Sequence, residues 1–384
     1  MKVVAFGTYD ATAHPRVQVL IDGLRERGVD VREIVAPLGL DTARRVELLR
    51  KPWLLPVLVA RLLRRWLTLA GRARRLTRDE WPSHVLVGYL GHFDVLLARV
   101  LFPSATIVLD HLIFAAGTAR DRGVGTGVRT VLLSGLDRLA IAAADVVVTD
   151  TAEHAAQVPA RRRRDAVVVP VGATQAWFDA GARASATDVS GGGVLTVGFF
   201  GLFTPLQGAP VIAEALRLLD RRGVRVRVTL VGSGQDAAVV RAVLAGMDSS
   251  DGAGSTVEVT WHDWVGPAEL PDLVAGHDVC LGIFGDTSKA RAVVPNKVYQ
   301  GAAAGCAVVT SDTGPQRRAF GDAAVFVPPG DAGALATAIE TFTDRLALTR
   351  ARAAGRAAAQ RFTARAVVAP LVDALDTAPA TSSR

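Results

Sequence analysis

Lysine is rare in this chain, and its placement marks a candidate binding segment. Only four of the 44 lysine and arginine residues are lysines, and two of these, Lys289 and Lys297, lie within nine positions of each other. The lysine ammonium is a compact charge that binds phosphate, and arginine does not replace it in every geometry. We therefore expect a phosphate-binding site in this segment, with chance clustering as the alternative.

The residues around the second lysine have the pattern of a helix start. The run VCLGIF predicts a strand, and Pro295, Asn296 and Lys297 then open a helix that ends near Gly305. Proline suits the first turn of a helix, where free N–H groups and the helix dipole attract an anion. Lys297 would add its charge at that point.

Two earlier loops carry glycines at the ends of predicted strands. GLFTPLQG contains Gly201 and Gly208, and LVGSGQD contains Gly232 and Gly234. A strand that ends in glycine before a helix can bring backbone N–H groups to a phosphate. Many strand–helix loops look like this, however, and LVGSGQD lacks the third glycine of a dinucleotide fingerprint. A purely structural role for both loops therefore stays open.

Short apolar strands that alternate with helical stretches are the elements that must position these residues. Such a pattern is typical of parallel sheets, which bind ligands at the carboxyl ends of their strands. We expect helices at 15–28 and 126–144, among others, and an α/β fold of two doubly wound, Rossmann-like domains. The predicted strands are 2–6, 29–35, 84–89, 105–109, 145–149 and 166–170 in the first half, and 195–200, 225–231, 256–260, 278–283, 306–310 and 323–327 in the second.

A change of composition divides the two halves. Residues 180–194, AGARASATDVSGGGV, are small and polar and resemble a linker. We expect an N-terminal domain at 1–180, a C-terminal domain at 195–365, and a C-terminal helix and tail at 366–384. Helices near 331–342 and 344–376 would complete the fold. A cleft between two domains is the default place for a ligand.

Four polar residues follow the first predicted strand. Thr8, Asp10, His14 and Arg16 lie where a parallel sheet binds its ligands, and we expect them to contact a ligand. Asp10 is the better candidate for a general base, although a helix-capping role would also explain it.

The bulk composition limits the class of protein. The 384 residues suit two domains, and 50% apolar with 21% charged residues is an ordinary globular balance. No apolar run approaches the roughly 20 residues of a membrane span, and the N-terminus resembles a strand more than a signal peptide. Cys280 and Cys306 lie in apolar contexts, so we expect buried thiols in a cytoplasmic protein.

The net charge of +7 is concentrated in one segment. Residues 44–78 interleave leucine, valine and tryptophan with many arginines. A basic amphipathic helix of this kind can lie on an anionic membrane, which would give a peripheral location on the inner face of the membrane. A solvated helical insertion explains the pattern equally well. No recognised nucleic-acid motif accompanies the charge, so we expect no nucleic-acid partner.

Several of these motifs resemble one enzyme family. PNKVYQGAAAGCAVVTSD, preceded by LVGSGQD and GLFTPLQG, resembles the donor domain of family 4 glycosyltransferases of the group 1 type. GTYDATAHPRVQVLIDGLRERG and DRLAIAAADVVVTDTAEH resemble parts of the family's N-terminal domain, so the resemblance spans roughly residues 1–375. It implies the GT-B fold and a retaining, metal-independent, hexosyltransferase-type enzyme whose UDP- or GDP-linked sugar is a substrate, with no cofactor.

The resemblance also assigns the donor site. Pro295, Asn296 and Lys297 match the family's diphosphate-binding turn, and Gln300 replaces a glutamate that hydrogen-bonds the ribose. Trp264 and Val265 match a segment whose backbone contacts the base. A second family glutamate falls on Ala292, and the loop with Asp286, Thr287 and Lys289 would substitute for it. The first glycine loop completes the predicted donor site with Gly201, Thr204 and Gln207, where Gln207 and Phe203 stand near the family's usual cations.

The same resemblance assigns the acceptor to the N-terminal domain at 1–180 and the donor to the C-terminal domain at 195–365. It implies that Thr8, Asp10, His14 and Arg16 contact the acceptor.

The mechanism follows from the same resemblance. His111 would hydrogen-bond the donor sugar or the leaving phosphate, and a structural loop histidine is the alternative. Because no nucleophile is evident, we expect a front-face transfer in which Lys289, Lys297 and the helix N-terminus stabilise the departing diphosphate. The catalytic residues are thus His111, Asp10 and Lys289. No metal is expected, because the sequence has no metal-ligand spacing.

Other activities remain open at this point. The acceptor would be a lipid-linked intermediate, a cell-envelope polysaccharide or a small molecule. A catalytically degenerate nucleotide-binding protein is suggested by Ala292 and Gln300, and a nucleotide-sugar epimerase would use the same donor site. A dinucleotide-dependent dehydrogenase is disfavoured because the first strand is followed by FGTYDA, which lacks the glycine fingerprint.

Overall fold

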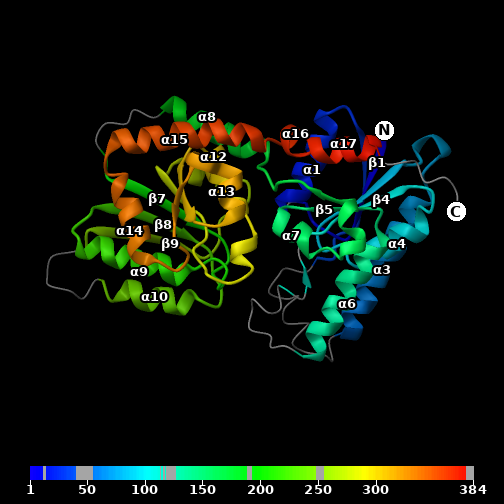
Figure 1. The fold of residues 1–384 in the computed structure, drawn as a ribbon, viewed down its shortest axis with the longest axis horizontal. Helices are drawn as coiled ribbons and strands as arrows, with labels where there is room; N and C mark the ends of the chain where they lie inside the picture. The colour runs from blue at the N-terminus through cyan, green and yellow to red at the C-terminus, as the bar shows by residue number, and fades with distance from the viewer. Residues whose placement is uncertain are drawn as a thin grey trace. The chain divides into compact units, whose positions relative to one another are not determined.

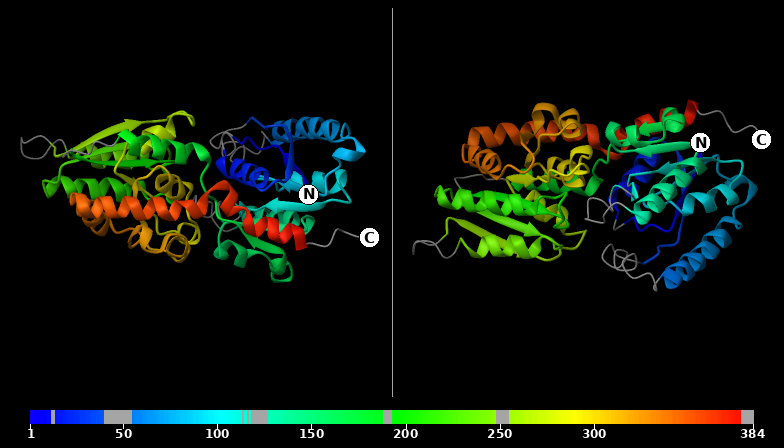
Figure 2. Two further views of the ribbon diagram at one scale, coloured as in Figure 1. Left: turned by 90° about the horizontal axis from the view of Figure 1, so that it is seen from above. Right: turned by 60° about the horizontal axis from the view of Figure 1, so that its bottom comes forward.

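The chain divides into two compact units in the computed structural model, which describes residues 1–11, 14–39, 55–112, 114–115, 117, 127–187, 193–247 and 255–377. The first unit holds Met1–Ala119 and Gly125–Pro170 together with the C-terminal segment from Val367, and the second holds Val171–Ala366. Each unit is a parallel sheet with helices on both faces (Figures 1 and 2).

The first unit contains a six-stranded sheet in the order β2-β1-β3-β4-β5-β6. Every pairing is parallel. The order reverses between β1 and β3, and such a switch point is where doubly wound sheets bind ligands. The strands are β1 Lys2–Gly7, β2 Asp30–Val35, β3 His84–Val87, β4 Thr106–Asp110, β5 Val146–Thr149 and β6 Ala166–Val168.

One face of this sheet is covered by three helices that share a core with it. Leu69 of α3, Ala98 of α4 and Ile141 of α6 belong to the same buried cluster as Val4, Val85 and other strand residues. Pro15 opens α1 in the first turn, where its fixed φ and missing N–H cost nothing. The helices are α1 Pro15–Glu26, α3 Leu55–Ala73, α4 Asp94–Leu101, α6 Val128–Ala143, α7 Ala152–Gln157 and α17 Ala369–Thr377.

The second unit repeats this plan with a different strand order. Its six parallel strands lie in the order β12-β11-β10-β7-β8-β9, so its switch point lies between β7 and β10. The strands are β7 Leu195–Phe200, β8 Val226–Val231, β9 Val257–His262, β10 Val279–Leu281, β11 Ala307–Ser311 and β12 Val325–Val327. The helices are α8 Gln175–Thr187, α9 Ala209–Arg221, α10 Ala237–Ala245, α11 Leu270–Ala275, α12 Asn296–Ala303, α13 Gly314–Phe320, α14 Ala332–Thr341, α15 Arg345–Ala359 and α16 Ala364–Val367.

The secondary structure confirms all twelve predicted strands and corrects two other expectations. The predicted linker at 180–194 is wrong in its first half, because α8 runs to Thr187. Alanine and arginine favour helix there, and Gly181 lets α8 approach the backbone of Ala303 closely. The predicted helix 344–376 is broken into three, because Phe362 turns inward to pack on Tyr299.

The basic segment is helical in its described part, as predicted. Residues 44–54 lie outside the described residues, and Leu55–Ala73 forms α3. No helix in the described ranges is both long enough and apolar enough to cross a membrane.

Candidate active site

Two glycine loops of the second unit are in direct backbone contact. A Cβ atom on Gly232 would lie 1.9 Å from the carbonyl oxygen of Gly201, and one on Gly234 would lie 2.4 Å from that of Phe203. All three glycines have positive φ. The N–H groups of Gly201 and Phe203 donate to the second loop over 2.9 Å. Glycine is therefore required at these positions to join the carboxyl ends of β7 and β8.

Lys297 extends from the first turn of α12 into this joint. Its Nζ lies 3.0 Å from the point where a Cβ on Gly201 would stand, and 3.7 Å from the centre of the Phe199 ring. It donates a hydrogen bond to Oε1 of Gln207. The side chain is buried, and this burial lowers the pKa of Lys297 to about 7. The predicted cation thus lies at the switch point of the sheet.

The N-terminus of α12 is uncapped by any side chain in the described part of the chain. Pro295 is the residue before the first helical turn, and its backbone is extended. The first N–H groups of a helix lack partners within the helix, so Asn296 and Lys297 lie where such N–H groups occur, and their binding of an anion stays a prediction. Gln300 lies three residues further along the same helix and is buried.

The other predicted donor residues lie on the loops that follow neighbouring strands. Thr204 accepts a hydrogen bond from the N–H of Gln207 in the turn after β7. Trp264 is 75% exposed in the loop after β9, and Val265 beside it is half-buried. Lys289 is half-buried in the loop after β10, ahead of the buried Ala292. The sequence did not indicate Phe199, because a core aromatic in a strand has no distinctive signal.

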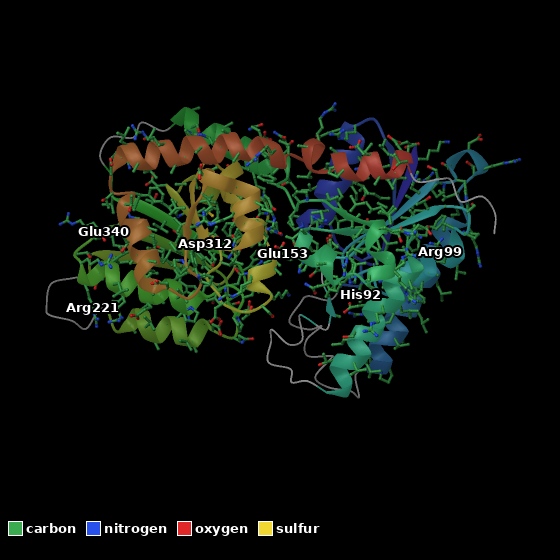
Figure 3. All side chains as sticks on the ribbon, in the orientation of Figure 1. His92, Arg99, Glu153, Arg221, Asp312 and Glu340 are labelled. Atoms are coloured by element: carbon green, nitrogen blue, oxygen red, sulfur yellow. The ribbon has the colours of Figure 1, made fainter. Side chains whose placement is uncertain are left out.

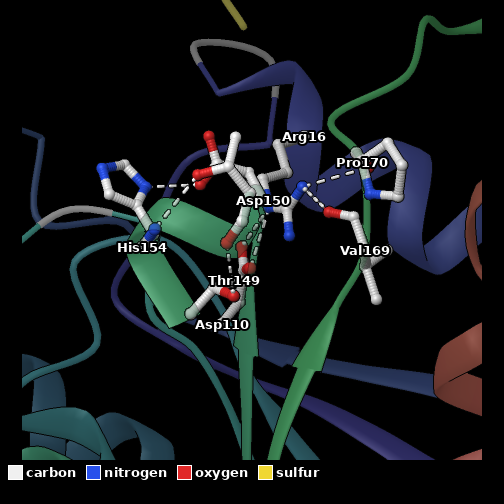
Figure 4. A network of polar contacts seen from close by, with 8 residues as sticks. Arg16, Asp110, Thr149, Asp150, His154, Val169 and Pro170 are labelled. Atoms are coloured by element: carbon white, nitrogen blue, oxygen red, sulfur yellow. Dashed lines mark hydrogen bonds and ion pairs between the residues drawn. The ribbon is translucent and has the colours of Figure 1, made fainter. Parts of the chain in front are cut away.

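The corresponding edge of the first unit holds a buried ion pair. Nε of Arg16 in α1 lies 2.8 and 3.0 Å from the two carboxylate oxygens of Asp110 at the end of β4 (Figure 4). Its Nη1 donates to the carbonyl oxygens of Val169 and Pro170 at 3.0 and 3.2 Å. Burial raises the pKa of Asp110, while Arg16 opposes this rise. Arg16 therefore holds β4 and the end of the first unit together, and its acceptor role stays a prediction.

Thr8, the first of the predicted acceptor residues, is hydrogen-bonded to Asp94. Its Oδ2 accepts hydrogen bonds from the backbone N–H and the hydroxyl of Thr8 at 2.7 and 2.8 Å, and its Oδ1 accepts one from Trp66 at 2.9 Å. The sequence analysis missed Asp94, which lies 86 positions from Thr8 and belongs to no motif.

Two other predicted acceptor residues lie at the surface beside the switch point of the first unit. Asp10 is exposed, and its carbonyl oxygen accepts from the N–H of His14 at 3.1 Å. The His14 ring stacks on Tyr89, which follows β3, with 3.7 Å between ring centres.

His111 lies in a buried cluster with two residues that the sequence did not indicate. His92, labelled in Figure 3, shares a hydrogen bond of 2.8 Å with Oδ1 of Asp137, and Nε2 of His111 lies 3.7 Å from the same oxygen. Nε2 of His111 has no hydrogen-bond partner among the described residues. Burial lowers the pKa of His111 to about 3, and His92 adds to this, so the ring is neutral.

The same cluster has the side chains that could hold a metal. In the described part of the chain, His92, His111 and Asp137 offer ligand atoms within 4.8 Å of one another. Two imidazoles and a carboxylate suit zinc. In this structure, however, a hydrogen bond already joins His92 with Asp137. The expected absence of a metal therefore stays a prediction.

Most of the second unit matches the model of a known protein family. Residues 194–345, which include the glycine joint and Lys297, match the family model of glycosyl transferases group 1. HepE from Anabaena, solved with UDP, covers 98% of this chain and 99% of its own at 14% identity, with a TM-score of 0.63. The chain has the GT-B fold.

Two other solved GT-B structures are similar over nearly the whole chain. Sucrose-phosphate synthase from Thermosynechococcus elongatus has 14% identity, covers 94% of this chain and 95% of its own, and gives a TM-score of 0.64. The UDP-forming α,α-trehalose-phosphate synthase from Burkholderia vietnamiensis has 14% identity, covers 100% and 98%, and gives 0.66. No curated protein matches the sequence significantly. The predicted fold and the group 1 resemblance are confirmed, and assignment to family 4 stays a prediction.

Proposed function

We propose that this chain is a retaining glycosyltransferase that uses a nucleotide sugar, UDP- or GDP-linked, as its donor. The observation that carries the proposal is the placement of Lys297, on the first turn of α12 and against Gly201 at the switch point of the second sheet. The family match over residues 194–345 supports it. Among similar structures, Anabaena HepE was also solved with UDP-glucose.

The electrostatics of the second unit suit a diphosphate. A helix N-terminus attracts anions. The backbone N–H groups of Asn296 and Lys297 precede the first hydrogen bond within the helix, so they can donate to phosphate oxygens. Lys297 has a pKa of about 7 when the site is empty, because burial disfavours its charge. A bound diphosphate would restore that charge. Binding would then be coupled to the uptake of up to one proton.

A front-face transfer needs little more from the protein than position and charge. The bond between the anomeric carbon and the diphosphate oxygen breaks, and the acceptor oxygen bonds to the same face of that carbon. The acceptor's proton passes to the leaving phosphate oxygen, with Asp10 as the alternative base. Lys297, Lys289 and the α12 N-terminus stabilise the developing charge, and the neutral His111 ring hydrogen-bonds the sugar or the phosphate. No step requires a metal.

The acceptor belongs to the first unit in this proposal. Asp10 and His14 are placed to contact it, since they lie at the surface by the switch point between β1 and β3. Thr8 and Arg16 would position the neighbouring acceptor residues, because Thr8 is hydrogen-bonded to Asp94 and Arg16 to Asp110. A lipid-linked intermediate or a cell-envelope glycan is the acceptor class that we propose.

A second candidate function is a nucleotide-binding protein without turnover. It is favoured by Ala292 and Gln300, which are buried at the two positions where the resembled family has glutamates. The donor sugar then loses one carboxylate partner and the ribose another. Hydrolysis or transfer of a radiolabelled donor sugar would exclude this candidate, and a product with the sugar still linked to its nucleotide but inverted at one carbon would identify an epimerase.

The experiment that tests the proposal is calorimetric titration of UDP, GDP, TDP and ADP into the wild type and Lys297→Ala. We expect one diphosphate to bind and the substitution to weaken it by about 1.5–3 kcal/mol, the range for a hydrogen bond to a charged group. Lys2→Ala, which removes an exposed lysine of the first unit, is the control and should bind like the wild type. If no diphosphate binds, or if Lys297→Ala binds as tightly as the wild type, the donor site is not here.

A further inference from the structure

Helix α3 exposes apolar residues next to its buried side. The buried side packs into the core through Leu69 and Ala73, and Trp66 donates to Asp94. The neighbouring side exposes Val59 and Leu63, each by 51%, and Leu67 by 76%. These three residues are spaced by four, so they form one stripe along the helix. A surface helix that only completes a core is polar over its whole exposed side, whereas the exposed side of α3 carries this apolar stripe beside its arginines.

Arginines without acidic partners line the same helix. Arg61, Arg64 and Arg65 lie between the residues of the apolar stripe, and the sequence from 55 to 78 contains no aspartate or glutamate. Within the described residues none of these three arginines forms an ion pair. Exposed arginines of the second unit, such as Arg227 and Arg241, pair with a nearby carboxylate at 3.2 and 2.9 Å. Among the described residues, the charge of these three arginines is therefore not neutralised by an acidic side chain.

The neighbouring helices extend this surface. Helices α3, α4 and α6 share one core cluster and cover the same face of the first sheet, so their outer sides face away from it together (Figure 1). Single exposed apolar residues are normal on proteins, but eight large ones on one helical layer are not. Besides the α3 stripe, the exposed apolar residues are Val57 of α3, Val100 of α4, and Val131, Leu132 and Leu139 of α6.

We propose that the outer face of the α3–α4–α6 layer docks on an anionic lipid bilayer. The apolar side chains would enter the boundary between headgroups and acyl chains, and the arginines would bind the anionic headgroups. A second copy of the chain fits less well, because it would bring the same unpaired positive charges face to face. This proposal does not depend on the donor site, which lies in the second unit.

The test is flotation of the full chain with vesicles of phosphatidylcholine, with and without phosphatidylglycerol. We expect binding only to the anionic vesicles, weakened by salt because the attraction is screened. Leu63→Glu with Leu67→Glu, and separately Arg61→Glu with Arg64→Glu, should each lower the partition coefficient at least about tenfold. Matched controls on α15, Leu346→Glu and Arg345→Glu with Arg350→Glu, should bind like the wild type.

Three results would overturn the proposal. These are equal binding to neutral and anionic vesicles, α3 variants that bind as the controls do, and a concentration-dependent dimer in light scattering that Leu67→Glu dissociates. The last result would show instead that copies of the chain meet at this face. Thermal melting and diphosphate titration of the α3 variants show whether they fold. Because they keep the donor site, a failure of the proposed enzyme activity would appear in the titration and not in the flotation.

Discussion

Different contacts hold the carboxyl edges of the two sheets together, although both sheets are parallel and six-stranded. In the second unit, glycine backbones touch, and within the described residues one buried lysine has only an amide oxygen as its hydrogen-bond partner. In the first unit, Arg16 and Asp110 form a buried ion pair, and Thr8 is bonded to Asp94. The second edge thus has an amine without an acidic partner among the described residues, which our proposal assigns to a diphosphate, whereas in the first edge buried charges satisfy one another.

The outer surfaces of the two units differ in how their exposed arginines are paired. Several exposed arginines of the second unit pair with carboxylates of their own unit, as Arg222 does with Glu340. Arg61 and Arg64 of α3 in the first unit form no ion pair among the described residues, and apolar residues are exposed beside them. We infer that the second unit binds its diphosphate at the edge of its sheet. The first unit would bind the acceptor at a sheet edge and a lipid bilayer at its helical face.

The largest effect is expected where a buried charge loses its partner. Arg16→Ala leaves Asp110 uncompensated, so the free energy of unfolding of the first unit should fall by about 3–5 kcal/mol. Arg227→Ala breaks a surface pair in the second unit and should change it by about 0.5 kcal/mol or less. Denaturant titration followed by hydrogen exchange in peptides of each unit measures both. If the two substitutions lowered the free energy of unfolding equally, the buried ion pair would stabilise its unit no more than the surface ion pair does.

The next effect concerns the glycine joint. Gly232→Ala adds a Cβ atom that would clash with the Gly201 carbonyl oxygen at an unfavourable φ of 138°, so the second unit should lose about 2–4 kcal/mol of unfolding free energy. Gly223→Ala is the control, since its φ is also positive but nothing lies within 4 Å, and it should cost about 1 kcal/mol. The same denaturant titration compares the two. A stable Gly232→Ala protein would mean that the loops do not need to touch.

The smallest effect is a pH dependence of Lys297. Below pH 7 Lys297 carries its proton in both the folded and the unfolded state. Between about 7 and its ordinary pKa of 10.5, only the unfolded state carries the proton, so stability rises with pH. From pH 7 to 9 the wild type should gain about 1–3 kcal/mol relative to Lys297→Met, and its diphosphate affinity should fall.

The comparison with Lys297→Met removes other titrations from this measurement. Burial raises the pKa of Cys280 to about 12, so this thiol changes stability only above pH 9, outside the range compared. Unfolding midpoints are measured at several pH values, and calorimetry in buffers of different ionisation enthalpy measures proton uptake on binding. An unchanged difference between the two proteins across this range would show that Lys297 is charged in the empty site.

Local patterns were enough to predict much of this molecule. The twelve strands follow from short apolar runs rich in valine, and the start of α12 follows from Pro295 with Lys297 two residues later. The helix α8 was missed because its alanine-rich sequence has a composition that fits both a helix and a linker. His92 and Asp137 were missed because neither residue belongs to a motif.

The sequence by itself determined which segments are strands, where α12 begins, and that one stretch is both basic and apolar, because these properties depend on residues within a few positions. Only the tertiary structure decided which side chains meet. Lys297 reaches Gln207 over 90 positions and Arg16 reaches Asp110 over 94. Such pairs depend on the order of strands in each sheet. That order results from the burial of whole helices against the sheet, and no local pattern encodes it.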